Sequence, residues 1–242
     1  MNAVHPHTWK LTVAEAIRLQ KELSLRVLPH DSFQSLHHVA GVDISVTGGR
    51  ARAAAVVLTF PGLQPVEEAT AERAIEFPYV PGLLAFREIP AILDALSKLR
   101  TEPDLILADA QGLAHPRRFG LACHLGVLLD KPTIGCAKSR LRGRHDEPSR
   151  EAGSWAPLLD RGETIGAALR TKSSTRVIYV SVGHRVSLES AIRLTLGCCT
   201  KYRLPEPTRL ADRVAGGGAI LPPLKPARRR AVSRPKTART QR

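Results

Sequence analysis

The stretch ILADAQGLAHPRRFG, residues 106–120, joins a short apolar run to an acid and a basic cluster. The run is short and almost wholly apolar, which predicts a buried strand. It delivers Asp109 to the end of that strand, and His115, Arg117 and Arg118 follow within nine residues. We therefore expect a loop that holds a carboxylate close to positive charge at the carboxyl end of a strand.

Upstream of this stretch, the hydrophobic spacing predicts a helix, a meander of three antiparallel strands and a second helix. The helices are expected over residues 11–27 and 83–99, and the strands over residues 37–46, 51–60 and 66–77. The second helix contains Pro90, which we expect in the first turn or at a kink, because proline removes a helical hydrogen bond.

Downstream of the stretch, helical and strand patterns alternate. We expect a helix over 117–129, strands over 132–138, 163–171 and 176–183, a helix over 187–199 and a loop over 204–212. This order predicts an α/β fold with a mixed sheet flanked by helices. Residues 1–215 are predicted to form a catalytic domain. Residues 216–242 are rich in Gly, Pro and Arg without an apolar period, and we expect a basic, disordered tail.

The charge of the chain favours a polyanionic partner. The formal net charge is +14, and eight of these charges lie in residues 225–242, which leaves +6 for the rest of the chain. The tail has no acid and no aromatic side chain, so it is suited to contact phosphates without reading sequence. Nucleic acid is the first candidate partner, although charge alone does not separate a nuclease from other basic proteins.

The sequence carries no sign of export or of membrane insertion. The N-terminal residues 1–20 break their apolar character every few positions, and no window is long and apolar enough for a membrane span. Cys123, Cys136, Cys198 and Cys199 lack the paired spacing of a zinc site. We therefore expect a cytoplasmic protein with reduced thiols and no membrane partner.

Three acids are spread over segments that a mixed sheet could bring together. Asp43 lies in mid-strand, on the opposite side from Val42 and Ile44, while Glu88 lies near a helix start and Asp109 at a strand end. Any one of them could instead cap a turn or a helix. Gathered carboxylates need a cation, and Mg²⁺ prefers such oxygen ligands. A site of this kind is suited to phosphodiester hydrolysis.

Six blocks of the sequence, in order, resemble the endonuclease V family. They are GVDIS at 41–45, FPYVPGLLAFRE at 77–88, DAQGLAHPRRFGLACHLG at 109–126, PTIGCAKSRLRG at 132–143, GHRVSL at 183–188 and YRLPEPTRLAD at 202–212. The resemblance runs from about residue 12 to residue 214, and several blocks are long. It implies a ribonuclease H-like fold, in agreement with the order of elements expected above.

The resemblance also implies an activity. Members of the family are Mg²⁺-dependent DNA repair nucleases that recognise deaminated bases, chiefly deoxyinosine, and cut the second phosphodiester bond on the 3′ side; Mn²⁺ is expected to substitute. One alternative is an inosine-specific endoribonuclease of the same fold. Another is a nucleic-acid-binding module without catalysis, against which the three acids argue. We expect a monomer whose partner is DNA containing deoxyinosine or another deaminated base, with inosine-containing RNA as the alternative.

The resemblance assigns catalytic and metal-binding roles to individual residues. Asp43, Glu88 and Asp109 match the catalytic, metal-binding acids, and Lys138 matches a catalytic lysine placed near the scissile phosphate. Asp212 occupies a position at which some members carry a histidine near the metal, so we treat it as a further candidate ligand, with a surface aspartate as the alternative.

DNA contacts are expected from residues around the same segments. Tyr79 matches a wedge that enters the duplex where the damaged base is extruded. The other candidates are Gly82, Gly112, His115, Arg117, Arg118, Lys138 and Leu141, and at least one of the arginines could instead be structural. The aspartate loop departs from the family pattern at Ala110, where glycine is common, so its backbone could differ slightly.

Overall fold

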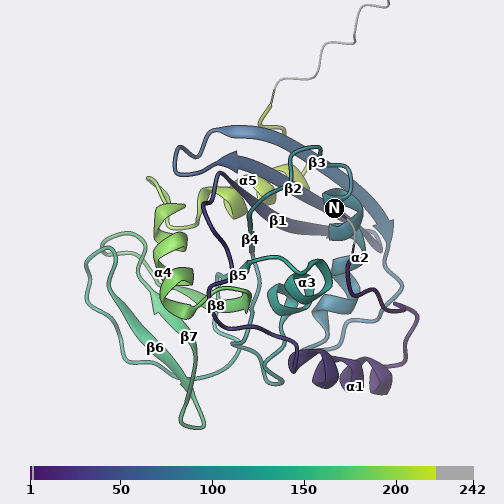
Figure 1. Cartoon of the computed structure of the whole chain (residues 1–242), viewed down its shortest axis with the longest axis horizontal. Helices are drawn as coiled ribbons and strands as arrows, with labels where there is room; N and C mark the ends of the chain where they lie inside the picture. Colours follow the sequence, from purple (N-terminus) through teal and green to yellow (C-terminus); the bar gives the residue numbers. More distant parts are fainter. Residues whose placement is uncertain (2, 222–242) are drawn as a thin grey trace, which may run out of the picture.

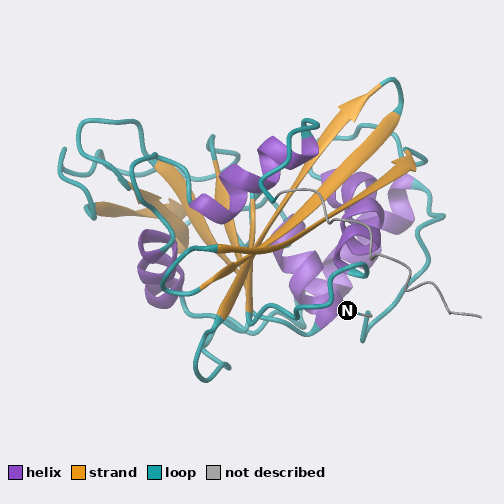
Figure 2. Ribbon diagram, turned by 90° about the horizontal axis from the view of Figure 1, so that it is seen from above, coloured by secondary structure: helices purple, strands orange, loops and turns teal. Residues whose placement is uncertain are grey.

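A single mixed sheet carries helices on both faces in the computed structural model, which describes residue 1 and residues 3–221 (Figures 1 and 2). The elements are α1 (Val13–Ser24), β1 (His38–Thr47), β2 (Arg50–Thr59), β3 (Pro65–Ala74), α2 (Leu84–Leu96), β4 (Leu105–Ala108), α3 (Leu121–Leu129), β5 (Thr133–Ala137), β6 (Trp155–Asp160), β7 (Glu163–Leu169), β8 (Ile178–His184), α4 (Leu188–Gly197) and α5 (Glu206–Ala215). The eight strands follow the order β3-β2-β1-β4-β5-β8-β7-β6. The predicted mixed sheet flanked by helices is confirmed.

Strand β1 joins the two halves of the sheet. It pairs with β2 in antiparallel fashion and with β4 in parallel fashion, and β2 pairs antiparallel with β3. The predicted three-strand meander is therefore confirmed. In the parallel pair, Val42 lies opposite Ala108. The next residues along each chain, Asp43 and Asp109, consequently leave the ladder side by side.

Each face of the sheet is buried by a different pair of helices. On one face, α2 and α3 cover apolar side chains of β1, β2 and β4, and α1 packs in turn against α3. On the other face, α4 and α5 cover the alternate side chains of the same strands together with those of β5, β7 and β8. Because side chains alternate along a strand, Val42 faces α2 while Asp43 faces α5.

The predicted loop over 204–212 is wrong, because residues from Glu206 to Ala215 form helix α5. The prolines in this segment favoured a loop. However, Pro205 is the N-cap and Pro207 lies in the first turn, where a missing N–H costs nothing. Leu210 and Val214 then bury against the sheet. The error matters because this helix carries Asp212.

Three smaller differences have local causes. The expected helix over 117–129 begins only at Leu121, since Arg118 has φ of +55°, which no right-handed helix accommodates. Strand β6 was not predicted, and it contains Pro157, which an edge strand tolerates. Pro90 lies inside α2 rather than in its first turn, in a helix held by a buried apolar face.

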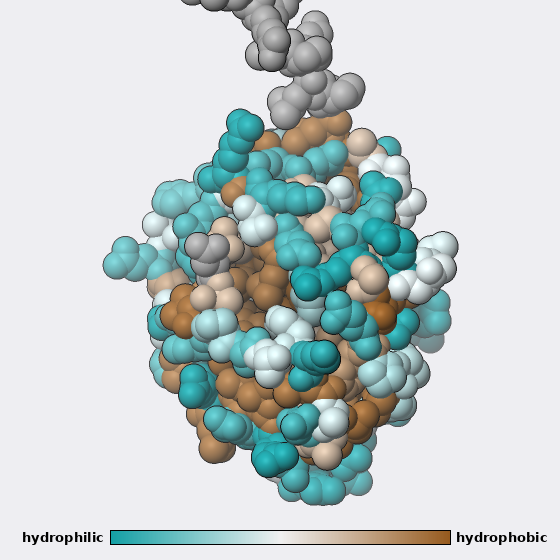
Figure 3. All heavy atoms as spheres, turned by 90° about the vertical axis from the view of Figure 1, so that its right-hand side faces the viewer, coloured by the Kyte–Doolittle hydropathy of each residue, from teal (hydrophilic) through white to brown (hydrophobic). Residues whose placement is uncertain are grey.

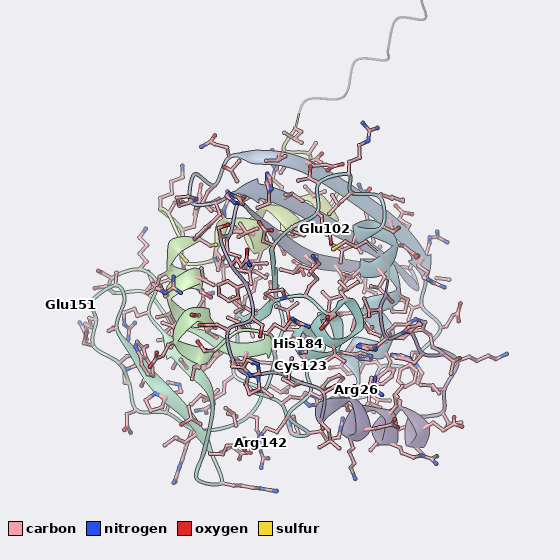
Figure 4. All side chains as sticks on the ribbon, viewed as in Figure 1. Arg26, Glu102, Cys123, Arg142, Glu151 and His184 are labelled. Carbon is pink, nitrogen blue, oxygen red and sulfur yellow. The ribbon has the colours of Figure 1, made fainter. Side chains whose placement is uncertain are left out.

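In the part of the chain that the structure describes, the four cysteines form no disulfide, and one side of the surface mixes hydrophilic with hydrophobic residues. All four cysteines are free thiols, and Cys123, labelled in Figure 4, is buried with its Sγ 3.4 Å from the carbonyl oxygen of Val182. Among residues 1 and 3–221, no helix has the length and apolar character needed to cross a bilayer. On the side that carries α1 and α2, hydrophilic residues surround patches of hydrophobic ones (Figure 3).

The predicted tail lies mostly outside the described residues. Residues 222–242, which hold all eight tail charges, are not described. Its first residues are described: Gly216 caps α5, and the backbone N–H of Ile220 donates a hydrogen bond of 3.0 Å to Glu68 on β3. The packed structure therefore continues a few residues past the expected boundary at 215.

Gly41 sets the distance between β1 and α5, and this gives a first prediction. A Cβ at position 41 would lie 2.0 Å from the backbone carbonyl carbon and oxygen of Pro207. Gly41→Ala should lower the free energy of unfolding by roughly 1–3 kcal/mol, the usual cost of overpacking, because α5 must move. Urea unfolding measures this, with Gly216→Ala as the control, since a Cβ there meets only ordinary contacts from 3.4 Å. Equal losses in the two variants would contradict the close approach.

Candidate functional site

Three aspartates from three elements meet at one point of the sheet. Asp43 lies on β1, Asp109 directly follows β4, and Asp212 lies on α5. Each offers a carboxylate oxygen within 4.8 Å of the others. The sequence predicted the approach of Asp43 and Asp109, and the unexpected helix supplies Asp212. Asp212, for which the sequence left a ligand and a surface aspartate as alternatives, therefore lies beside the other two carboxylates.

Lys138 and Glu88 are two further charged residues close to this group. Lys138, directly after β5, places its Nζ 2.5 Å from Asp109 Oδ2 and 3.4 Å from Asp212 Oδ1. Glu88 lies in the second turn of α2 and is not one of the three residues whose oxygens cluster within 4.8 Å. Glu88 is nonetheless close enough to Asp109 for the charge of that carboxylate to raise its pKa.

Burial and mutual repulsion make the acids reluctant to ionise together. Burial, reinforced by the negative charge of Asp109, raises the pKa of Asp43 to about 8. Burial likewise raises the pKa of Glu88 to about 7. Burial also raises the pKa of Asp109, although its hydrogen bond with Lys138 acts in the opposite direction. The fold therefore holds carboxylates where their negative charge is not fully compensated by the protein.

The donor set fits a hard divalent cation. Three carboxylate oxygens within 4.8 Å can approach one ion of the Mg²⁺ class, which prefers oxygen ligands and keeps several water molecules. A bound cation would also relieve the repulsion that raises the pKa of Asp43. Lys138 supplies one positive charge to this group of three acids, which leaves room for a cation on charge grounds.

A groove of about 470 Å³ opens beside Asp109. The loop from Tyr79 to Gly82 forms one wall, and residues 137–141 after β5 form another. Two large side chains stand at its rim in contact with solvent, since Tyr79 is 72% exposed and Leu141 is 50% exposed. Of the predicted DNA contacts, Tyr79, Gly82, His115, Lys138 and Leu141 line this groove.

The basic cluster after Asp109 is engaged with the protein itself. The carbonyl oxygen of Gly82 accepts hydrogen bonds from Gln20, from His115 at 3.0 Å and from Arg117 at 2.6 Å. Arg117 also donates to the side chain of Gln20. Burial, together with the charge of Arg117, lowers the pKa of His115 to about 4, so this imidazole is neutral at pH 7. These contacts fix the loop wall of the groove.

Arg118 is likewise bound to other groups of the protein. Its guanidinium forms ion pairs of 2.9 Å with Asp160 and 2.8 Å with Glu163, at the two sides of the β6–β7 turn. The predicted DNA contacts of His115, Arg117 and Arg118 thus compete with existing bonds to protein groups. Arg117 and Arg118 both have the contacts with protein groups that the alternative of a structural arginine expects, and their DNA contacts stay a prediction.

Two residues of the aspartate loop have roles that the sequence did not predict. Gly112 packs against β8, where a Cβ would lie 2.0 Å from the carbonyl oxygen of Val182, and its N–H donates to Ser181 Oγ at 2.8 Å. Gln111 lines the groove; its amide nitrogen donates to the carbonyl of Ser139 at 2.9 Å. Its buried Oε1 has no hydrogen-bond partner among the described residues. Glutamine in a loop is too common for the sequence to single it out.

Comparison with known proteins identifies relatives of the whole described domain. The family model described as Endonuclease V matches residues 20–213. A relative named Endonuclease V from Trichormus variabilis is 56% identical over 218 residues, covering 89% of this chain and 99% of that protein.

Solved structures agree with the sequence relatives. The Streptomyces avermitilis Endonuclease V has a TM-score of 0.83 and 46% identity, with coverage of 89% of this chain and 96% of that one. Ciona intestinalis Endonuclease V, solved with a 24mer DNA containing an inosine followed by a ribo-adenosine, has a TM-score of 0.73 and 30% identity, with coverage of 84% and 96%. The ribonuclease H-like sheet is thus shared with these structures.

The raised pKa of Asp43 predicts a stability cost in the absence of metal. A carboxyl group with a folded pKa near 8 and a usual value of 3.8 contributes its full stability only below pH 3.8, and this contribution is lost as the pH rises toward 8. In EDTA, Asp43→Asn should therefore stabilise the protein relative to wild type by roughly 3–4 kcal/mol more at pH 8 than at pH 5. Urea unfolding measures the difference, with exposed Asp146→Asn as control. If the difference in free energy of unfolding between Asp43→Asn and wild type were the same at both pH values, the raised pKa of Asp43 would be contradicted.

Proposed function

The chain belongs to the endonuclease V family of DNA repair nucleases, and we propose that it cuts DNA at the second phosphodiester bond 3′ to deoxyinosine with Mg²⁺ as cofactor. The observation that carries the proposal is the group of Asp43, Asp109 and Asp212 beside a groove large enough for a base. Mn²⁺ is the expected substitute, since it accepts the same oxygen ligands.

Asp43, Asp109 and Asp212 are the proposed ligands of the cation. When bound, Mg²⁺ supplies a Lewis acid that activates water and stabilises negative charge on the scissile phosphate. Glu88 is assigned to the edge of the site, where its carboxyl group, with a pKa of about 7, can take up or release a proton near neutral pH. Its position outside the close carboxylate group makes a direct bond to the same ion the weaker assignment.

Lys138 is proposed to contact the scissile phosphate. Its ammonium group lies against Asp109 and Asp212, and its side chain is 41% exposed toward the groove. Burial disfavours its positive charge, but the hydrogen bond with Asp109 more than compensates, so the pKa of Lys138 is raised. A lysine that keeps its charge can stabilise negative charge as it develops on the phosphate oxygens.

The groove is proposed to receive the extruded base. Its walls offer backbone groups near Gly82 and side-chain amide groups at Gln111, and Leu141 is available for apolar contact. Tyr79 stands at the rim between Pro78 and Pro81, where an exposed ring can replace the stacking lost when the base leaves the duplex.

An RNA substrate is the second candidate. The Ciona relative was solved with an inosine followed by a ribo-adenosine, which places a 2′-hydroxyl next to the inosine of that ligand. Cleavage of matched DNA and RNA strands, each with one inosine, decides between the two proposals. We also propose a monomer that works in the cytoplasm, a location that suits its four free thiols.

The metal assignment predicts loss of cleavage when a ligand is removed. Asp43→Ala or Asp109→Ala should reduce Mg²⁺-dependent nicking of an inosine duplex by at least about 100-fold, because the cation loses a carboxylate. Binding of the same duplex in EDTA and the fold, measured by circular dichroism, should persist. The exposed Asp146→Ala is the matched control. Near-normal turnover of either ligand variant would refute the proposed metal site.

The wedge assignment predicts a loss that depends on base pairing. Tyr79→Ala should weaken discrimination between inosine and normal duplex by roughly 1–3 kcal/mol, the usual worth of aromatic stacking on a base. Cutting of an inosine in single-stranded DNA should change less. Tyr202→Ala, which removes a 41% exposed tyrosine outside the groove, is the control. Equal losses on paired and unpaired targets would count against a wedge.

A further inference from the structure

The sheet face that carries Asp43 continues into a second, basic hollow. The ladder between β1 and β2 is regular from His38 to Thr47, so every second side chain of β1 points to the same face. Beyond Asp43 these are Ser45, which pairs with Arg52, and Thr47, which pairs with Arg50. All four line a hollow of about 270 Å³, together with Glu72, Ala215 and Gly216.

This hollow lies one step beyond the carboxylate group along both β1 and α5. Position 45 is roughly 7 Å from Asp43 along the strand, at about 3.3 Å per residue. On α5, Ala215 follows Asp212 by three residues, which is close to one helical turn. The distance of roughly 7 Å from position 43 to position 45 along β1 is about the rise of two nucleotides of a DNA strand. A strand with one phosphate at Asp43 can therefore present another phosphate to the hollow.

Arg52 differs from the other half-buried arginines in having no partner. Arg118 and Arg185 form ion pairs with acids, and Arg117 donates to a carbonyl oxygen. The Arg52 guanidinium has no hydrogen bond or ion pair with any residue among 1 and 3–221, and its Nε is buried from solvent. A cation that is partly desolvated and unpaired costs free energy unless an anion binds it.

The neighbours of Arg52 complete a site for phosphate oxygens. Arg50 is 59% exposed and holds only a long ion pair of 3.8 Å with Glu72. Ser45 and Thr47 also line the hollow, and their hydroxyl groups can donate hydrogen bonds. Glu72, in register with Arg52 on β3, is the one acid among the described residues that lines the hollow, and its charge opposes the binding of an anion.

We propose that Arg52, assisted by Arg50, binds a backbone phosphate of the substrate strand at a subsite next to the metal-binding carboxylates. This inference rests on the proposed function, because it takes nucleic acid as the source of the phosphate. The contact is to the backbone, so it strengthens binding of damaged and undamaged DNA alike. Arg52 positions the strand and does not take part in the chemical step.

The experiment compares DNA binding of three single variants with that of the wild type. Kd is measured in EDTA over a range of salt concentrations, for an inosine duplex and for the matched undamaged duplex. Arg52→Gln should weaken binding to both by about tenfold, the usual effect of losing a charged hydrogen bond, and make the slope of log affinity against log salt shallower by about one. Glu72→Gln should strengthen binding, since it removes the opposing charge.

Arg73→Gln is the matched control. Arg73 lies next to Glu72 on β3, but it points to the other face of the sheet and pairs with Asp94 on α2 at 3.2 Å. Its loss removes the same single charge, but from the opposite face of the sheet. We expect less than a twofold change in Kd. Equal effects of Arg52→Gln and Arg73→Gln would overturn the proposal, because they would show a general effect of net charge.

Two further arms separate the remaining outcomes. Arg52→Lys should retain the slope of log affinity against log salt, because it keeps the charge. If Arg52→Gln fails to fold, Arg50→Gln is measured in its place. An unchanged Kd of Arg50→Gln would then count against the subsite. Inorganic phosphate that raises the melting temperature of wild type but not of Arg52→Gln, without any DNA effect, would assign the hollow to a free anion instead. Failure of the wild type to cut inosine DNA would refute the proposed function, whereas the comparison on undamaged duplex would still test Arg52.

Discussion

The parallel pairing of β1 with β4 is the constraint on which the site depends. Four residue pairs, from Val39 with Leu105 to Val42 with Ala108, fix the register. The next residues on the two chains are Asp43 and Asp109, and their carboxylates are close because the backbone ladder places them so. The paired residues of both strands are buried on both faces, so the repulsion between the acids cannot separate them without opening the core. The hydrophobic core thus holds an arrangement that electrostatics alone disfavours.

Helix α5 adds the third acid, and it does so through a close contact of two backbones. Gly41, two residues before Asp43, lets the start of α5 approach β1 at a distance that no side chain would permit. The buried residues Leu210 and Val214 then fix the rotation of the helix, which turns Asp212 toward the other two aspartates. The same helix ends at Ala215, which lines the basic hollow together with the C-cap Gly216. One packed helix therefore sets the geometry of two neighbouring polar sites.

The sequence predicted those parts of the site that depend on strand order and failed where tertiary packing decides. The acids Asp43 and Asp109 could be recognised because each lies at an interruption of an apolar strand pattern. Asp212 remained ambiguous, since prolines at 205 and 207 suggested a loop and only burial against the sheet reveals a helix. The orphan side-chain oxygen of Gln111 could not be predicted either, because an unpaired atom is a property of its surroundings.

The arginines that bind other protein groups can be distinguished from an arginine that has no such partner. The basic residues that follow Asp109 looked suited to phosphates, yet their donors are bound to Gly82, Asp160 and Glu163, so they tie the loop after Asp109 to neighbouring parts of the protein. The sequence did not single out Arg52, because alternating arginine and alanine at the start of a strand is a common pattern that predicts no particular site. Its lack of any partner among the described residues is visible only in the fold. Positive charge available to DNA is therefore identified by what a side chain does not contact, and not by how densely arginines cluster along the chain.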